Sequence, residues 1–274
     1  MCGTAASLSL SDIQLSNGLR LRYAEQGDPD GEVIILLHGI ADSWFSWSRV
    51  LPCLQSGRRA IAIDLRGHGD SDRPTQGYGL REVAADVVAF MAAKRIARAA
   101  VVGHSMGSFV AQQVALAAPR RVSRLVLVAS GTAPSRFNDM LELQRTVNAL
   151  PDPIPVEFIR EFQASTIHRA VPDEFMERVV AESRKLPALV WREAMAGMLA
   201  TGRPQRLRAH GIPTLILWGD RDAMTSRAEQ EALTMLVGGE LKVYEATGHA
   251  PHWERPEEFA VDLEDFVDSA ALSP

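Results

Sequence analysis

The sequence predicts an α/β fold in which an inserted group of helices interrupts a mainly parallel β-sheet. Short runs rich in Val, Ile and Leu are typical of strands that are buried on both faces of such a sheet. After Tyr78 the pattern alternates between helix and strand, which indicates crossover connections. The strand pattern disappears between residues 133 and 205 and then returns. We therefore expect the sheet to be completed after the insertion.

Each element follows from hydrophobic spacing and turn residues. Alternating stretches at Leu8–Leu15 and Leu19–Glu25, joined by Asn17-Gly18, predict an antiparallel hairpin at one edge of the sheet. Apolar runs predict further strands at Val33–Leu37, Ala60–Asp64, Ala99–Gly103, Leu125–Ala129, Thr214–Trp218 and Leu241–Glu245. Helical spacing predicts helices at Leu80–Ala93, Met106–Ala118, Arg227–Val237 and Pro256–Asp268. The expected domains are a core, residues 1–132 and 206–274, and a helical cap, residues 133–205.

Composition limits the possible partners. The chain has 274 residues and a formal net charge of −5. Its Lys and Arg residues are scattered rather than gathered into a stripe, so nucleic acid is not an expected partner. Neither a signal-peptide pattern nor an apolar run of about 20 residues occurs in the sequence. These features predict a cytoplasmic protein without an integral membrane segment.

A nucleophile is predicted at Ser105. The segment from Val101 to Gly107 reads as a strand that runs through Gly-His-Ser-Met-Gly directly into a helix. A serine at such a turn is held out over the carboxyl end of the sheet, and the small residues Gly103 and Gly107 allow the backbone to approach closely. The N–H of Met106, at the helix N-terminus, points to where an oxyanion would develop.

A serine hydroxyl needs a base, and His249 is the preferred one of the seven histidines. It follows Gly248 in a loop after the last predicted strand, and such a loop lies on the same rim of the sheet as the nucleophile. His252, three residues later, is the competing choice.

The imidazole in turn needs a carboxylate that fixes its tautomer. The loop after Thr214–Trp218 carries Asp222, the preferred candidate, and Asp220, the alternative; either can instead cap a helix or form a surface ion pair. A second oxyanion donor is expected in the loop after Val33–Leu37, where Gly39 permits an unusual backbone and Ile40 supplies the N–H.

With these residues, the chain resembles the α/β-hydrolase superfamily over nearly its whole length. The resemblance rests on motifs in the family's order, namely His38-Gly39, Asp64-Leu65-Arg66-Gly67-His68-Gly69-Asp70-Ser71-Asp72, Gly103-His104-Ser105-Met106-Gly107, Trp218-Gly219-Asp220-Arg221-Asp222 and Gly248-His249. It implies a mostly parallel eight-stranded sheet, with helices on both faces and a helical cap after the sixth strand. It also implies a structural role for Arg66, His68 and Asp72.

The same resemblance implies a serine hydrolase, with Ser105, Asp222 and His249 as its triad and no cofactor or metal. Haloalkane dehalogenases and epoxide hydrolases of the superfamily have Asp where this chain has Ser105, so those activities are disfavoured. The carboxylesterase, lactonase and carbon–carbon hydrolase branch remains, although Ser108 stands where a third glycine is common.

The expected substrate is a small or medium, largely apolar ester or lactone. The apolar residues proposed to line its pocket are Trp44, Phe137, Met140, Trp191, Met195 and Met198, although most such side chains in a cap pack its helices together. One alternative is a carbon–carbon hydrolase acting on an aromatic ring-cleavage product. Another, of a different class, is a small-molecule receptor on the same fold with very slow turnover.

Overall fold

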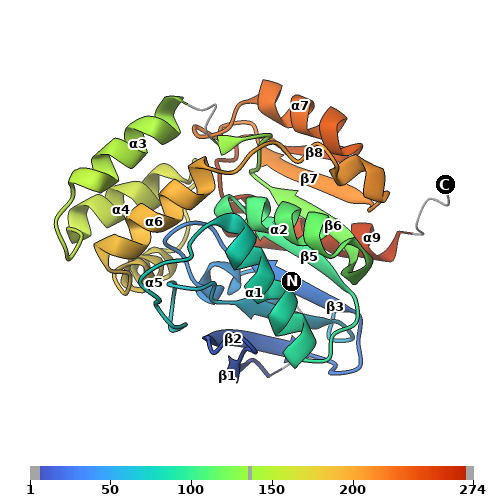
Figure 1. Ribbon diagram of the computed structural model, residues 1–274. Coiled ribbons are helices and arrows are strands. Elements are labelled where there is room, and N and C mark those ends of the chain that lie inside the picture. The colour runs from blue at the N-terminus through green and yellow to red at the C-terminus, as the bar shows by residue number, and fades with distance from the viewer. Residues whose placement is uncertain (1–6, 135–137, 270–274) are drawn as a thin grey trace.

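The computed structural model describes residues 7–134 and 138–269. Its centre is an eight-stranded sheet in the order β1-β2-β4-β3-β5-β6-β7-β8 (Figure 1). The strands are β1 (Ser9–Gln14), β2 (Arg20–Gly27), β3 (Val33–Leu37), β4 (Arg59–Ile63), β5 (Ala99–His104), β6 (Val122–Val128), β7 (Thr214–Gly219) and β8 (Glu240–Tyr244). Strand β2 is antiparallel to β1 and β4, and all other neighbours pair in parallel. The predicted fold class is confirmed.

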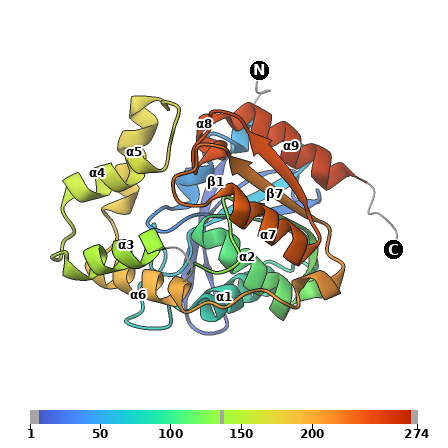
Figure 2. The ribbon, with the colours of Figure 1, turned by 90° about the horizontal axis from the view of Figure 1, so that it is seen from above.

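Helices cover both faces of this sheet, as the view from above shows (Figure 2). One face packs against α1 (Leu80–Ala93), α2 (Met106–Ala117) and α7 (Arg227–Val237), and the other against α9 (Pro256–Asp268). Shorter elements are η1 (Trp44–Trp47), η2 (Leu51–Cys53), η3 (Pro119–Arg121), η5 (Leu207–His210) and α8 (Pro251–Glu254). Because apolar helices cover both faces, every residue of β5 is buried.

The structure differs from the predicted bounds chiefly at β6. This strand begins at Val122, three residues before the predicted start at Leu125. Its first residues include Ser123 and Arg124, which are half-buried and polar, so the hydrophobic pattern hides them. A register irregularity between Ala99 and Ala100 of the neighbouring strand accompanies them. Pairing with β5 extends the strand where side-chain hydrophobicity does not.

Four helices of the described chain follow β6 and lie together beside the sheet (Figures 1 and 2). They are α3 (Asn138–Ala149), α4 (Val156–Ser165), α5 (Asp173–Ser183) and α6 (Ala188–Leu199). Trp191 of α6 holds two of them together, because it packs edge-on against Phe158 and Phe162 of α4 at ring distances of 5.9 and 5.3 Å. Apolar side chains of the insertion therefore belong to the same hydrophobic core as those of the main body.

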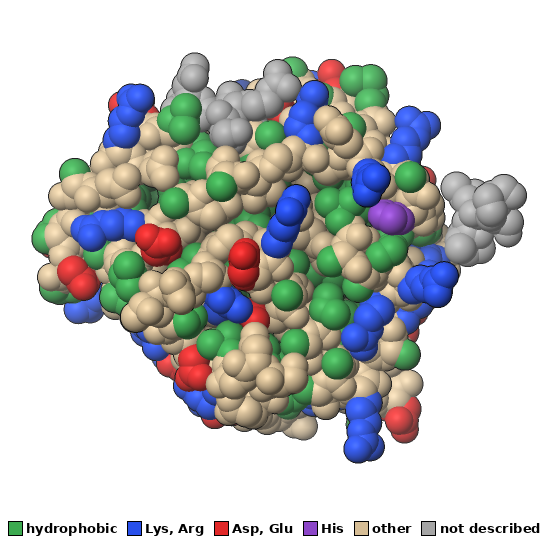
Figure 3. All heavy atoms as spheres, in the orientation of Figure 1, with side chains coloured by type: hydrophobic (Ala, Val, Ile, Leu, Met, Phe, Trp, Pro, Cys, Tyr) green, Lys and Arg blue, Asp and Glu red, His purple; other side chains and the backbone are tan. Residues whose placement is uncertain are grey.

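The surface seen in Figure 3 carries its basic side chains singly, among acidic, polar and apolar ones. Among the helices of the described ranges, none combines the length and apolar character that crossing a membrane requires.

Candidate active site

Ser105 occupies a strained turn between β5 and α2. Its backbone has φ 49° and ψ −119°, a conformation that L-residues with a Cβ rarely adopt and that clusters at functional sites. The turn is held because the Ser105 N–H donates to the Val128 carbonyl at 2.9 Å. A Cβ at Gly103 would lie 2.1 Å from the Gly107 oxygen, and one at Gly107 would lie 2.3 Å from the Leu37 oxygen. Only glycine fits at either position.

His249 and Asp222 form a buried pair at the same end of the sheet. The Nδ1 of His249 lies 2.8 Å from Oδ2 of Asp222, and the two side chains are 4% and 0% exposed. Since an ionised carboxylate only accepts, Nδ1 carries the hydrogen and Nε2 is left with a lone pair. Within the described residues Nε2 has no hydrogen-bond partner, and His249 and Ser105 line one cavity.

Asp222 is oriented by its own loop. It accepts hydrogen bonds from the Met224 N–H at 2.7 Å, the Thr225 N–H at 3.1 Å and the Thr225 hydroxyl at 2.5 Å. Burial alone would raise the pKa of Asp222, but His249 and these donors hold it below its ordinary value. The carboxyl is therefore ionised at neutral pH.

The two alternative residues lie in other surroundings. His252 is fully buried, its Nε2 lies 3.1 Å from the Ser46 hydroxyl, and its ring packs on Trp47 with centroids 4.5 Å apart. Burial lowers the pKa of His252 well below its ordinary value. Asp220 is exposed and lies 3.8 Å from the guanidinium of Arg221. Neither residue lines the cavity that contains Ser105.

The loop after β3 forms a turn beside Ser105. His38 shapes it, because Nδ1 donates to the Gly39 oxygen at 2.7 Å and Nε2 accepts from the Leu65 N–H at 3.0 Å. Gly39 and Ile40 both line the cavity, and Ala41 has a left-handed φ of 62°. The other candidate oxyanion donor, Met106, is buried at the first position of α2.

The cavity lies between the end of the sheet and the inserted helices. Of the predicted pocket residues, Met140 and Met198 line it. Trp191 and Met195 are instead buried in the hydrophobic core that includes α1 and α2, and Trp44 lies in the core on the other sheet face. Phe137 lies outside the described residues.

Several cavity residues were absent from the predicted set. They are Asp42, His104, Phe109, Ala129, Pro134, Leu143, Phe162, Gln163, Thr166, Met224, Thr225 and Trp253. Position in the sequence offers a signal for His104, which precedes the nucleophile, and for Thr225, which follows the Asp222 loop. No pattern distinguishes Gln163 or Thr166 from other polar residues of a helix end.

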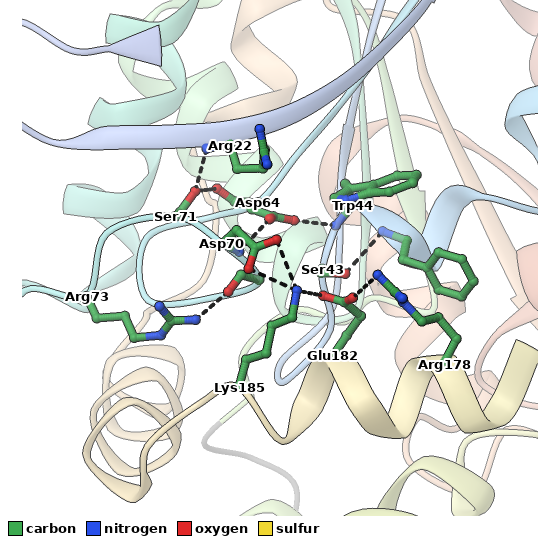
Figure 4. Close-up of polar contacts among 12 residues, drawn as sticks. Arg22, Ser43, Trp44, Asp64, Asp70, Ser71, Arg73, Arg178, Glu182 and Lys185 are labelled. Carbon is green, nitrogen blue, oxygen red and sulfur yellow. Dashed lines mark hydrogen bonds and ion pairs between the residues drawn. The ribbon is translucent and has the colours of Figure 1, made fainter. Parts of the chain in front are cut away.

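The Asp64–Asp72 segment holds the start of η1 in place. Asp64 is buried and accepts from the Trp44 N–H at 2.6 Å and the Asp70 N–H at 2.8 Å (Figure 4). Burial raises the pKa of Asp64 to about 7, although these N–H donors oppose the shift. Arg66 forks onto Asp86 of α1, with one bond of 2.7 Å. Within the described ranges, no group of three or more His, Cys, Asp or Glu side chains is arranged to hold a metal ion.

Comparison with known proteins places these features among hydrolases. The family model described as "alpha/beta hydrolase fold" matches residues 32–256. A curated relative, the dihydrolipoyllysine-residue acetyltransferase component of the acetoin cleaving system of Cupriavidus necator, is 30% identical over 93% of this chain and 67% of its own.

Two solved structures are similar along almost their entire chains. The esterase RhEst1 from Rhodococcus sp. is 25% identical, with a TM-score of 0.82 over 95% of this chain and 99% of that one. Est816, described as an N-acyl homoserine lactone degrading enzyme, is 29% identical, with a TM-score of 0.78 over 93% of this chain and 100% of that one.

Proposed function

Since this chain belongs to the α/β-hydrolase fold family, we propose that it is a serine hydrolase that cleaves a small or medium, largely apolar carboxylic ester or lactone. Ser105 is the nucleophile, His249 the general base and Asp222 the residue that orients the histidine. One observation carries this proposal. The 2.8 Å contact between His249 Nδ1 and Asp222 leaves a basic Nε2 without a partner, in the cavity that Ser105 also lines.

The proposed reaction has two acyl-transfer steps. His249 Nε2 takes the proton of Ser105 as the hydroxyl oxygen attacks the substrate carbonyl, and Asp222 stabilises the imidazolium. The N–H groups of Met106 and Ile40 hold the oxyanion. Collapse of the intermediate expels the alcohol, which receives the proton from His249. Water, activated by the same nitrogen, then attacks the acyl-enzyme and releases the acid.

The cavity supports the proposed substrate class. We propose that residues 133–205 act as a cap, because Met140, Phe162 and Met198 of the inserted helices face the cavity that contains Ser105. Its walls are mainly apolar side chains with a few polar groups among them, as is usual for a small-molecule site. An apolar acyl or alcohol group therefore fits better than a charged one. The similar esterase and lactone-degrading structures support the same class.

Hydrolysis of p-nitrophenyl esters from acetate to decanoate, two lactones and a ring-cleavage dienoate tests the proposal. Ser105→Ala is the matched inactive variant. We expect multiple turnover on an ester or lactone, and we expect Ser105→Ala to retain a residual acceleration of only roughly 10³–10⁴ over water. Turnover of the dienoate alone would indicate carbon–carbon hydrolysis instead. A folded wild type that turns over none of these substrates would favour the receptor.

A further inference from the structure

Asp42 is a buried carboxyl in the cavity that the proposed reaction does not use. It is 4% exposed and follows the turn at Gly39 and Ile40. Burial raises the pKa of Asp42 to about 7, against hydrogen bonds from Gln163, Ser46 and the backbone of Gly39. Burying a carboxyl is unfavourable unless its partners compensate. Its partners therefore indicate what it does.

One set of partners belongs to the turn at residues 39–42, which we call the oxyanion turn because it carries the Ile40 N–H. The Asp42 N–H donates to the Gly39 oxygen at 3.3 Å and so closes a four-residue turn. The third residue of this turn, Ala41, is buried with φ 62°, a left-handed conformation that is unfavourable for a residue with a Cβ. The peptide N–H of Ile40 lies within the turn. A group that fixes Asp42 therefore also fixes the direction of that N–H.

The other set of partners belongs to the inserted helices. Nε2 of Gln163, on α4, donates to Oδ1 of Asp42 at 3.1 Å and to the hydroxyl of Ser183, on α5, at 2.8 Å. Gln163 is 1% exposed and Ser183 is fully buried. Two helices of the insertion are thus connected by hydrogen bonds to the turn that carries Ile40.

We propose that Asp42 is a positioning residue that couples the docked cap to the oxyanion hole, because Gln163 holds its carboxyl and Asp42 holds the turn that carries the Ile40 N–H. This inference rests on the proposed hydrolase function. In this arrangement the oxyanion hole has its active geometry only while α4 is seated. Binding of a substrate beneath the helices and stabilisation of its oxyanion are then linked events.

A second polar link between the insertion and the core provides a control. Nζ of Lys185, which follows α5, lies 2.9 Å from Oδ1 of Asp70 and 2.8 Å from Glu182 (Figure 4). This link reaches the Asp64–Asp72 segment rather than the oxyanion turn. The Lys185 and Asp70 side chains are also 30% and 48% exposed, so solvent screens their attraction.

The groups that face Asp42 decide the effect of its ionisation. Nδ1 of His104 lies 3.9 Å from Oδ2 of Asp42, and the charge of His249 also acts on this carboxyl. His252 is connected to Asp42 through the Ser46 hydroxyl, and Glu182 lines the same small gap as Asp42. Nε2 of His104 donates to the His249 carbonyl at 3.0 Å, and burial lowers the pKa of His104 to about 3. No permanent cation is therefore among these neighbours. An ionised Asp42 places negative charge beside the site of the developing oxyanion and slows acylation.

The test uses the full chain, p-nitrophenyl butyrate and kcat and KM measured from pH 5.5 to 9. We expect Asp42→Ala and Gln163→Leu each to lower kcat about tenfold, and the double variant to lose no more than about tenfold, because both break one chain of contacts. Lys185→Gln should keep kcat within about twofold of wild type. In the double variant with Gln163→Leu, the two fold-losses in kcat should multiply, as expected for independent sites. Asp42→Asn keeps an acceptor for Gln163 and cannot ionise. Its kcat relative to wild type should rise as pH passes about 7.

Three outcomes would overturn the inference. The first is a roughly hundredfold loss in the double variant, and the second is a loss in Lys185→Gln as large as that in Gln163→Leu. The third is an unchanged kcat in Gln163→Leu, which decides the matter even where Asp42→Ala does not fold. Full turnover by Ser105→Ala would instead refute the proposed hydrolase mechanism, so the two failures are distinguishable.

Discussion

The Asp222 carboxylate receives a 2.8 Å hydrogen bond from His249, although 27 residues separate the two in sequence. Strand β7 ends at Gly219, shortly before Asp222, and β8 ends at Tyr244, shortly before the loop that holds His249. Since the two strands are parallel neighbours, both loops leave the same edge of the sheet. The pair therefore follows from strand order and not from proximity in the chain.

Substitution of Asp222 by Asn should lower kcat by about 10⁴, because an amide can stabilise the wrong imidazole tautomer and carries no charge to balance the imidazolium. Asp220→Asn is the matched control, since it makes the same change two residues away at an exposed carboxylate. We expect the control to remain within about threefold of wild type. Steady-state kinetics of both variants would contradict the assignment if Asp220→Asn were the inactive one.

Enlarging the side chain at Met140 should shorten the preferred acyl chain. Met140 lines the cavity from α3 and is half-buried, so Trp at this position occupies substrate space without entering the main core. Met235→Trp, at a side chain that is 70% exposed, controls for the substitution itself. The measurement is kcat/KM across the p-nitrophenyl series. An unchanged chain-length optimum in Met140→Trp would mean that the acyl group binds elsewhere.

Gly107→Ala should destabilise the protein by roughly 1–3 kcal/mol or more, because the new methyl group would overlap backbone atoms. Its Cβ would lie 2.3 Å from the Leu37 oxygen and 2.5 Å from the His38 oxygen. Gly202→Ala is the control, since a Cβ there meets nothing within 4 Å. Thermal unfolding should show a lower midpoint for Gly107→Ala only. Equal midpoints would show that the turn can open without cost.

The stability of the wild type should fall relative to Asp42→Asn as pH rises from about 4 to about 7. In this window the folded protein keeps the proton of Asp42, whose pKa is raised to about 7 by burial, whereas the unfolded chain has released it. The folded state therefore binds more protons, and its stability decreases with pH by at most about 1.4 kcal/mol per unit. Urea unfolding at several pH values measures the difference. A constant difference would mean that Asp42 is ionised throughout.

Sequence pattern was sufficient for elements whose own residues carry the signal. The bounds of α1, α7 and α9 match the predicted ranges, since each has apolar residues on one helical face. The Gly-His-Ser-Met-Gly turn was predictable because its conformation admits few residue types, and the structure places Ser105 there with φ 49°. The early start of β6 was not predictable, because pairing with β5 defines it.

The residues that line the cavity could not be predicted from the sequence. Met195 and Met198 lie on the same predicted helix and have the same chemistry, yet only Met198 reaches the cavity. The angle at which α6 packs decides between them, and many angles suit the same apolar residues. The contact between Gln163 and Asp42 joins residues 121 positions apart on separate elements, and neither residue belongs to a motif of the other.

The sequence by itself determined the α/β class, the order of the elements and the candidates Ser105, Asp222 and His249, because local spacing and backbone restriction act within short segments. Only the tertiary structure shows that Asp222 pairs with His249, whereas Asp220 lies near Arg221 and His252 contacts Ser46, since burial and hydrogen-bond geometry depend on how strands and loops meet. It alone also places Asp42 between the turn at residues 39–42 and the inserted helices, because that arrangement arises from packing between distant segments.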